Sequence, residues 1–275
     1  MKNSMDRIIR RMADPTLRRR MVRKLLKRFP LGSFDTRLEV GAFERPWYAW
    51  CLYHAALEAK ALGHAAITAI ELGVAGGNGL VQLCEIQDQV QAETGIRIFT
   101  QGLDGGTGLP ETSDARDLLY CWPAGSFPMD YVKLTQRLRG RADIVIGDVA
   151  QTAKQLSIRA DAPLGAVLFD LDFFTSTRDA FALLEHPNVL PRVWCYFDDI
   201  VGTPDGVFSD YTGVRAAIRQ FNANKSEREA HLSQAYVFRN HYPEEWHQLI
   251  YVYHRMTHPD YNRRLSHQKL VLDLT

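Results

Sequence analysis

The chain has 275 residues, of which 46% are hydrophobic and 24% charged, and its formal net charge is +1 at pH 7. It has ample apolar material for one large core, and a nearly neutral chain lacks the basic surplus that would make nucleic acid its main partner. Its four cysteines share no metal-ligand spacing, and no stretch reaches the roughly 18 apolar residues of a membrane span, so we expect a cytoplasmic protein with reduced thiols.

Residues 1–45 are predicted to form a basic helical extension. Eleven Lys or Arg and two Asp lie in residues 1–30, a net charge of +9 that leaves −8 for the rest of the chain. Apolar residues recur at helical spacing among these basic residues: Leu17, Met21, Leu25, Leu26 and Phe29. Such a helix packs on its own domain or on a second copy, or it lies on an anionic membrane surface. We expect the packed arrangement.

The region after residue 64 reads as a strand, a glycine-rich turn and a helix. Residues 65–70 are an apolar run, residues 71–80 read ELGVAGGNGL, and residues 81–86 have helical character. Glycines let a ligand approach the backbone, and a helix start offers free N–H groups. The dinucleotide pattern G-x-G-x-x-G, started at Gly73, fails because Ala75 and Asn78 replace its later glycines. The pattern E-x-G-x-x-x-G fits, with Glu71 and Gly77 at its ends. The alternative is a tight turn that binds no ligand.

Two further strands are each followed by an acidic residue. Residues 96–103 lead into Asp104, and residues 142–147 lead into Asp148. A carboxylate such as Asp104 accepts well from the two hydroxyls of a vicinal diol. The connection at 105–141 is long for this kind of fold and rich in aromatic residues, Gly and Pro. It is predicted to form a lid or a wall beside a ligand site, or else a surface excursion.

The fourth and fifth predicted strands end in clusters of aspartates. Residues 163–169 run into Asp170-Leu171-Asp172, and residues 193–197 run into Asp198-Asp199. Four carboxylates at neighbouring strand ends repel one another unless a cation or shared protons compensate. Hard oxygen ligands of this kind suit Mg²⁺. In the alternative interpretation, Asp172 or Asp179 caps the next helix, which for Asp179 is the better explanation, and Asp198-Asp199 begins a solvated loop.

The last part of the chain completes a sheet. Residues 213–222 have helical periodicity, and residues 235–239 and 248–254 read as two strands with no helix between them, which predicts an antiparallel pair. The expected fold is therefore α/β, a Rossmann-like, doubly wound sheet of seven strands, mostly parallel with an antiparallel C-terminal edge pair and helices on both faces. The main domain is expected at 46–256, followed by a tail at 257–275.

The glycine motif and the strand-terminal acids resemble those of the class I S-adenosylmethionine-dependent methyltransferases, over roughly residues 65–255. The resemblance implies that S-adenosylmethionine binds at the ends of the strands. It places Asp104 on the ribose hydroxyls and Asp148 on the adenine amine, and the acid at Glu71 suits the amino group of this cofactor. The cofactor-binding residues that it implies are Glu71, Gly73, Ala75, Gly77, Asn78, Asp104, Asp148 and Asp170.

The aspartate clusters resemble those of the metal-dependent macrocin-type sugar O-methyltransferases. This implies a Mg²⁺ ion held by Asp170, Asp198 and Asp199, with Asp172 as the general base. The chain differs from that pattern at Leu171 and Phe173, where the family usually has Gly and Tyr. We therefore expect Mg²⁺-assisted O-methylation of a small-molecule hydroxyl, with no nucleic-acid partner. The sequence leaves open whether the protein forms a homo-oligomer. A non-catalytic cofactor-binding protein of the same fold is the main alternative, and a D-x-D glycosyltransferase is a further one.

Overall fold

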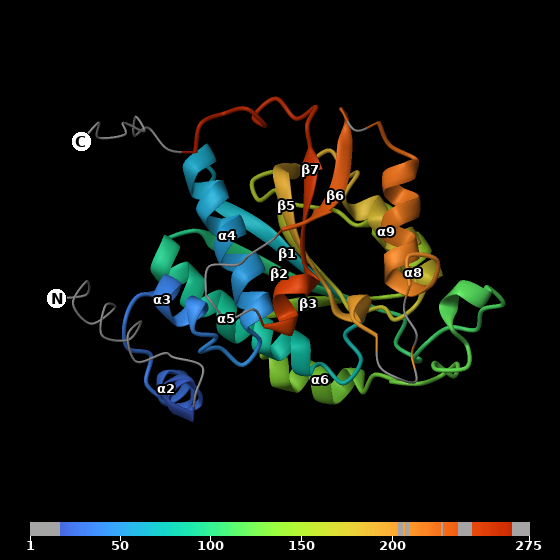
Figure 1. Ribbon diagram of the computed structural model, residues 1–275, viewed down its shortest axis with the longest axis horizontal. Coiled ribbons are helices and arrows are strands. Elements are labelled where there is room, and N and C mark those ends of the chain that lie inside the picture. The colour runs from blue at the N-terminus through green and yellow to red at the C-terminus, as the bar shows by residue number, and fades with distance from the viewer. Residues whose placement is uncertain (1–16, 203–205, 207–208, 227, 236–243, 266–275) are drawn as a thin grey trace.

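A twisted seven-stranded sheet lies between two layers of helices in the computed structural model of the chain (Figure 1). The structure describes residues 17–202, 206, 209–226, 228–235 and 244–265. The strands are β1 (Ala66–Leu72), β2 (Arg97–Asp104), β3 (Ala142–Ile146), β4 (Leu164–Phe169), β5 (Val189–Phe197), β6 (Ala230–Gln234) and β7 (Ile250–Arg255). The helices are α2 (Leu17–Arg28), α3 (Phe34–Glu39), α4 (Pro46–Leu62), α5 (Asn78–Thr94), α6 (Tyr131–Leu138), α7 (Val149–Gln155), α8 (Phe174–Ala180) and α9 (Gly213–Ala223).

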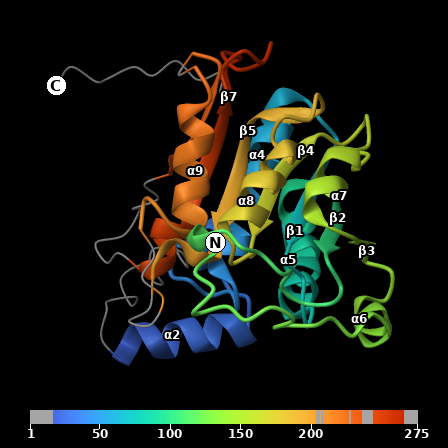
Figure 2. The same cartoon turned by 90° about the vertical axis from the view of Figure 1, so that its right-hand side faces the viewer.

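The strand order is β3-β2-β1-β4-β5-β7-β6, with β1 to β5 parallel and β7 antiparallel to both of its neighbours. Helices α4 and α5 pack against each other on one side of the sheet, and α8 packs with α7 and α9 on the other, as Figures 1 and 2 show. Every residue of β1 and β4 is buried, because helices cover both faces of these central strands. The predicted fold is confirmed.

The register of the three central strands determines where their ends meet. Leu72 of β1 lies beside Phe169 of β4, and Phe169 lies beside Phe197 of β5. These three residues are almost fully buried, so the strands end at one level, just beyond a hydrophobic layer. The residues that follow Phe169 and Phe197 are therefore brought together at the carboxyl edge of the sheet.

The antiparallel edge differs from the prediction in its position along the chain. The predicted strand at 235–239 lies almost entirely outside the described residues, and β6 is formed instead by Ala230–Gln234. Its partner β7 begins only at Ile250, since residues 245–249 form a 3₁₀ helix. The N–H of Ala235 donates to the carbonyl of Ile250, the first residue of β7. The pairing is therefore set by the start of β7.

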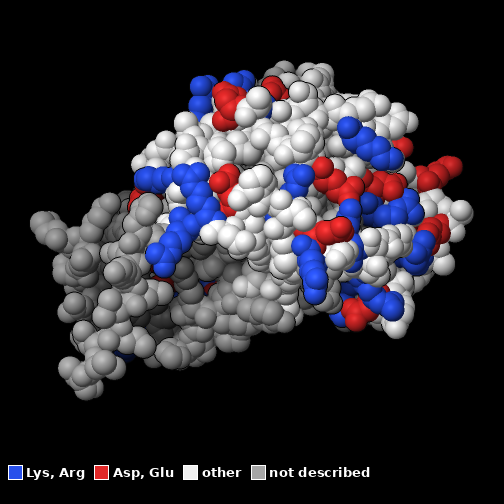
Figure 3. All heavy atoms as spheres, turned by 90° about the horizontal axis from the view of Figure 1, so that it is seen from above, with Lys and Arg blue, Asp and Glu red and all other residues white. Residues whose placement is uncertain are grey.

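The N-terminal helix α2 packs on the segment that follows it and contacts the main domain through Glu244. Leu26 of α2 is buried against Val40 and Ala42, and the guanidinium groups of Arg19 and Arg23 both donate to the carboxylate of Glu244. Residues 1–16 of the predicted extension and 266–275 of the predicted tail lie outside the described part of the chain. Among the described residues, no helix is both long and apolar enough to cross a bilayer. On the face seen in Figure 3, acidic and basic side chains are intermingled.

Candidate functional site

A cleft of about 590 Å³ lies at the carboxyl ends of the parallel strands. Its volume falls within the range of small-molecule sites. All eleven predicted site residues line it: Glu71, Gly73, Ala75, Gly77, Asn78, Asp104, Asp148, Asp170, Asp172, Asp198 and Asp199. The glycine turn between β1 and α5 forms one side of the cleft, which we call the glycine-loop side. The aspartates that follow β4 and β5 form the other, which we call the aspartate side.

Close packing explains two glycines on the glycine-loop side. Gly73 has a φ of +79°, and a Cβ there would lie 1.7 Å from the backbone oxygen of Asp170. A Cβ on Gly79 would lie 1.9 Å from Oε1 of Glu71. A larger residue at either position would push the loop away from β4 or displace the Glu71 carboxylate, so the motif has a steric cause in this fold.

The carboxylate of Asp104 holds the glycine turn in place. Its Oδ2 accepts from the N–H groups of Val74 and Ala75, both at 2.8 Å, and its Oδ1 accepts from the N–H of Gly106 at 2.6 Å. Ala75 has a positive φ of 45°, which these bonds support. Asp104 thus shapes the site whether or not it also contacts a ribose, the role predicted from the sequence.

Glu71 is fully buried at the floor of the cleft, and two residues that the sequence pattern did not indicate surround it. The hydroxyl of Tyr48 donates to Oε1 of Glu71 at 2.6 Å, and Arg45 donates to the Tyr48 oxygen at 3.4 Å. Burial raises the pKa of Glu71 to about 7, against the opposing effects of Tyr48 and Arg45. Its Oε2 is buried without a hydrogen-bond partner in the described structure. A buried acceptor of this kind fits the ammonium group of an amino-acid ligand.

Arg45 precedes α4, lines the cleft and has its guanidinium carbon 5.0 Å from the centre of the Tyr48 ring. Burial alone would lower its pKa, but Tyr48, Glu71 and Asp170 raise the pKa above the ordinary value. A permanent cation therefore lies beside the acidic floor of the cleft. Arg45 and Tyr48 lie more than twenty residues before the glycine motif, and only the packing of α4 on the sheet brings them to it.

Asp148 and Asn78 line the outer part of the cleft, and both have protein partners. The Asp148 carboxylate accepts from the N–H of Ala150 at 2.9 Å and so caps α7. The Asn78 side-chain oxygen accepts from Arg137 of α6 at 2.8 Å. Asp148 is exposed to solvent, and its predicted contact with adenine stays a prediction.

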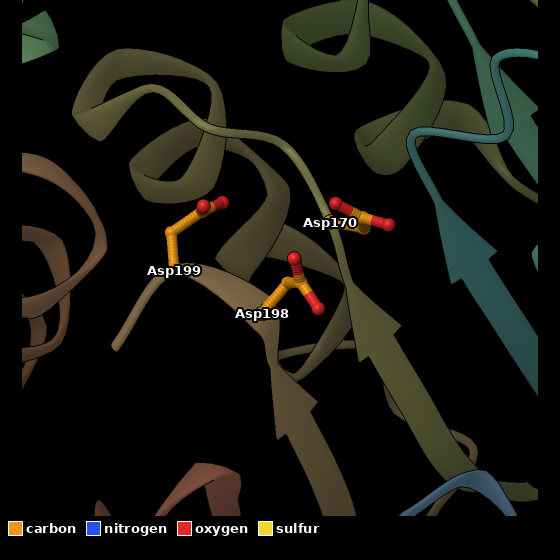
Figure 4. Close-up of side chains that lie close together, drawn as sticks. All are labelled: Asp170, Asp198 and Asp199. Atoms are coloured by element: carbon orange, nitrogen blue, oxygen red, sulfur yellow. The ribbon is translucent and has the colours of Figure 1, made fainter. Parts of the chain in front are cut away.

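Three carboxylates gather on the aspartate side (Figure 4). Candidate ligand oxygens of Asp170, Asp198 and Asp199 lie within 4.8 Å of one another. Asp198 and Asp199 are adjacent, and in a regular strand their side chains would point to opposite faces. Here β5 ends at Phe197, and Asp199 lies in a short 3₁₀ helix with non-helical angles (φ −91°, ψ 42°), which lets both side chains turn toward Asp170.

The aspartate side concentrates negative charge. Burial, reinforced by Asp198 and Asp199, raises the pKa of Asp170 well above its usual range. Burial and the neighbouring Asp172 and Asp198 raise the pKa of Asp199 in the same way. None of the four aspartates forms a salt bridge within the described part of the chain; Asp198 accepts from the hydroxyl of Tyr196. Oxygen donors alone, close together and without a salt bridge to any described cation, fit the preferences of Mg²⁺.

Asp172 lies at the edge of this cluster in an unusual backbone conformation. Its φ is +56°, and its N–H donates to Oδ2 of Asp199 at 3.2 Å. Burial, with Asp198 adding to it, raises the pKa of Asp172 to about 6. It does not cap the following helix, because the N-cap of α8 is Phe173, which makes no side-chain capping bond. The strained backbone instead directs this carboxylate to the cleft.

The helix-capping role favoured for Asp179 is wrong. Asp179 lies at the carboxyl end of α8, where its carboxylate accepts from the guanidinium of Arg178. The acidic group at the start of α8 comes instead from the long connection. The buried Asp117 accepts from the N–H of Thr175 at 2.9 Å and from its hydroxyl at 2.8 Å. Asp117 thus attaches the connection to the helix that follows Asp170–Asp172.

The long connection between β2 and β3 spans 105–141, as predicted, and contains α6 and a short 3₁₀ helix. Part of it lines the cleft through Leu109, Pro110, Trp122, Ser126 and Phe127. It therefore forms a wall beside the two groups of functional residues. Its aromatic and proline residues gave the signal for this wall in the sequence, whereas the role of Asp117 had no local signal.

No family model matches the sequence, and no curated protein does. The crystal structure of CalS11, calicheamicin methyltransferase, matches with a TM-score of 0.50 and 18% identity, over 76% of this chain and 77% of that chain. The O-methyltransferase NovP matches with a TM-score of 0.49 and 16% identity, over 76% of this chain and 91% of that chain. At such identities the likeness concerns the fold. The protein thus shares its fold, a seven-stranded Rossmann-like sheet, with the CalS11 methyltransferase structure.

Proposed function

We propose that the protein is an S-adenosylmethionine-dependent methyltransferase that methylates a hydroxyl group of a small-molecule acceptor with the help of Mg²⁺. One observation carries the proposal: a single cleft holds a glycine turn with a buried, partly unpartnered acid on one side and a cluster of carboxylates on the other. The first arrangement suits a cofactor with an amino-acid end. The second suits a cation beside the reacting groups.

The glycine-loop side would hold the cofactor. Oε2 of Glu71 would accept from the cofactor ammonium, and the cation of Arg45 would pair with the cofactor carboxylate. The remaining predicted contacts are Asp104 with the ribose and Asp148 with adenine. S-adenosylmethionine would supply an electrophilic methyl group, and the sulfonium is a good leaving group. The work of the protein is then to align the acceptor and to remove its proton.

The aspartate side would prepare the acceptor. Asp170, Asp198 and Asp199 are the residues that would hold Mg²⁺, which would lower the pKa of an acceptor hydroxyl. Asp172, with a pKa of about 6, is mostly ionised at neutral pH and can accept that proton. Trp122 and Phe127 of the wall would exclude water from the reacting groups.

Calorimetry with S-adenosylhomocysteine tests the cofactor site. Wild type should bind with a Kd in the micromolar range, and Glu71→Gln should weaken binding about 10- to 100-fold because a neutral amide cannot form an ion pair with the cofactor ammonium. Glu58→Gln is the matched control, since Glu58 is also buried, with a pKa of about 7, but pairs with Arg192 outside the cleft. Its affinity should equal that of wild type.

Two results would contradict the proposal. One is the absence of S-adenosylhomocysteine binding to a folded wild-type protein. The other is tight binding of a UDP-sugar in its place, which would support the glycosyltransferase interpretation of the D-x-D sequence. Binding of the cofactor with no turnover on a broad panel of hydroxylated acceptors would favour the non-catalytic alternative.

A further inference from the structure

The outward face of α2 is apolar although its inward face is already packed. Met21, Leu25 and Phe29 follow one another at intervals of four residues, with side chains 71%, 53% and 55% exposed. The N–H of Phe29 donates to the carbonyl of Leu25 at 2.8 Å, so Phe29 continues the helical geometry past the end of α2. The next large residue, Leu31, is 51% exposed. Met21, Leu25 and Phe29 thus form one exposed apolar strip along the helix, which we call the α2 strip.

Among the described residues, the packing of α2 leaves the α2 strip without a partner. Leu26 occupies the inward face together with Val22, and the pairs of Arg19 and Arg23 with Glu244 fix the rotation of the helix. Turning the strip inward would break these contacts. Figure 2 shows α2 lengthwise at the lower margin of the molecule, where a flat surface could reach it.

Every charged residue between Leu17 and Leu31 is basic. Seven Lys or Arg and no acidic residue lie between Leu17 and Leu31. Arg19, Arg23 and Lys27 pair with Glu244 or Glu44. The other four are exposed and form no ion pair with described residues: Arg18, Arg20, Lys24 and Arg28. The strip is therefore surrounded by positive charge that the described domain does not neutralise.

We propose that the α2 strip docks onto an anionic lipid surface. Amphipathic helices bind there by inserting apolar side chains to the level of the acyl chains while Lys and Arg contact the headgroups. A second copy of this chain is the weaker candidate, because two helices this basic would repel each other across a shared strip. Nucleic acid offers no place for three large apolar side chains in a row.

Co-sedimentation of the full-length protein with vesicles tests this. The protein should sediment with vesicles of equal parts phosphatidylcholine and phosphatidylglycerol, at least about tenfold more strongly than with phosphatidylcholine alone, and added salt should weaken the binding. Leu25→Ser/Phe29→Ser should weaken it about tenfold or more, because both inserted side chains are lost. Arg18→Gln/Lys24→Gln should weaken it about 30-fold.

The matched controls keep the same chemistry elsewhere on the surface. Val132→Ser/Tyr211→Ser removes two side chains that are 66% and 68% exposed, and Arg228→Gln/Arg264→Gln removes two exposed cations. Both controls should bind vesicles as wild type does. All variants should keep the wild-type melting temperature, because the substituted side chains of α2 are exposed to solvent in the folded protein.

Three outcomes would overturn the proposal. The first is equal sedimentation with neutral and anionic vesicles. The second is unchanged binding after both α2 double substitutions. The third is a wild-type dimer in sedimentation velocity that Leu25→Ser/Phe29→Ser converts to a monomer, with no vesicle binding by wild type, which would make a second copy the occupant. Loss of S-adenosylhomocysteine binding in a separate assay would bear on the proposed function and not on this surface.

Discussion

The two sides of the cleft differ in the surroundings of their acidic residues. On the glycine-loop side, Asp104 accepts three backbone N–H bonds and Glu71 accepts from Tyr48, so each carboxylate has its own donor. On the aspartate side, Asp198 and Asp199 also accept one hydrogen bond each, but Asp170 and Asp199 face other carboxylates, and the described structure gives the cluster no salt bridge. The first arrangement is typical of a preformed ligand pocket. The second, in which the negative charges lack a salt-bridge partner, is typical of a site that binds a cation.

The same contrast appears in how each side is assembled. The glycine-loop side is built mostly from residues 71–79, and its geometry is set by hydrogen bonds to Asp104 and by close contacts with Glu71 and with Asp170 after β4. The aspartate side needs β4 and β5 to end at one level and the long connection to attach through Asp117. Substitutions should therefore act on stability and cofactor binding on the first side, and on metal binding and chemistry on the second.

The largest effect is expected from Asp172→Asn. The amide cannot take a proton, and Asn tolerates the positive φ at this position, so the fold should persist. We expect kcat to fall about 10²- to 10⁴-fold on any acceptor that wild type methylates, with the cofactor Kd changed less than about twofold. Initial rates at saturating cofactor measure this. Asp179→Asn, in the following helix, should keep wild-type activity, and a similar loss in that variant would contradict the assigned role of Asp172.

Gly73→Ala should destabilise the protein strongly. A Cβ would lie 1.7 Å from the backbone oxygen of Asp170, so strand β1 and the segment after β4 must separate. We expect a loss of about 3 kcal/mol or more in the free energy of unfolding, measured by urea titration, together with weaker cofactor binding. Gly76→Ala, in the same turn, has no atom within 4 Å of its added Cβ and should be nearly neutral. Equal effects of the two substitutions would refute the steric explanation.

Glu71 should make the ligand-free protein less stable as the pH rises. Its pKa is about 7 in the folded protein against an ordinary 4.5, so between these values the folded state keeps a proton that the unfolded state has released. The contribution of Glu71 to stability is therefore lost progressively from about pH 4.5 to pH 7, by up to about 3 kcal/mol. Glu71→Gln should flatten this dependence by that amount in urea titrations at several pH values. Curves that keep the wild-type slope would show that Glu71 ionises normally.

Mg²⁺ should give the smallest of these effects, a rise in melting temperature of wild type that EDTA reverses. Stabilisation of about 1–3 kcal/mol corresponds to free Mg²⁺ some ten to a hundred times above its Kd. Since raised pKa values at Asp170 and Asp199 favour their protonated forms, the rise should be larger at about pH 8 than at about pH 6. Asp199→Asn should abolish the rise and leave cofactor affinity nearly unchanged, whereas Asp179→Asn should preserve it. A wild type that does not respond to divalent ions would remove the metal from the mechanism.

The sequence by itself determined the elements that depend on a short continuous stretch of residues. Apolar runs predicted the buried parallel strands, and the motif from Glu71 to Gly77 predicted the glycine turn. The acids at 104, 148, 170 and 198 could be assigned to one cleft because the carboxyl ends of parallel strands meet at one edge of the sheet. These inferences needed only the position of each residue relative to the end of its own strand.

Contacts between distant segments were decided by the tertiary structure. The attachment of Thr175 to Asp117, the approach of Tyr48 to Glu71 and the pairing of β6 with β7 each join segments whose separation carries no periodic signal. The inward packing of Leu26 likewise decided which apolar residues of α2 stay exposed. Hydrophobic spacing in a sequence identifies a helix face that can be buried. Whether that face is buried depends on the surfaces that the fold brings next to it, because the burial of a side chain is set by all of its neighbours.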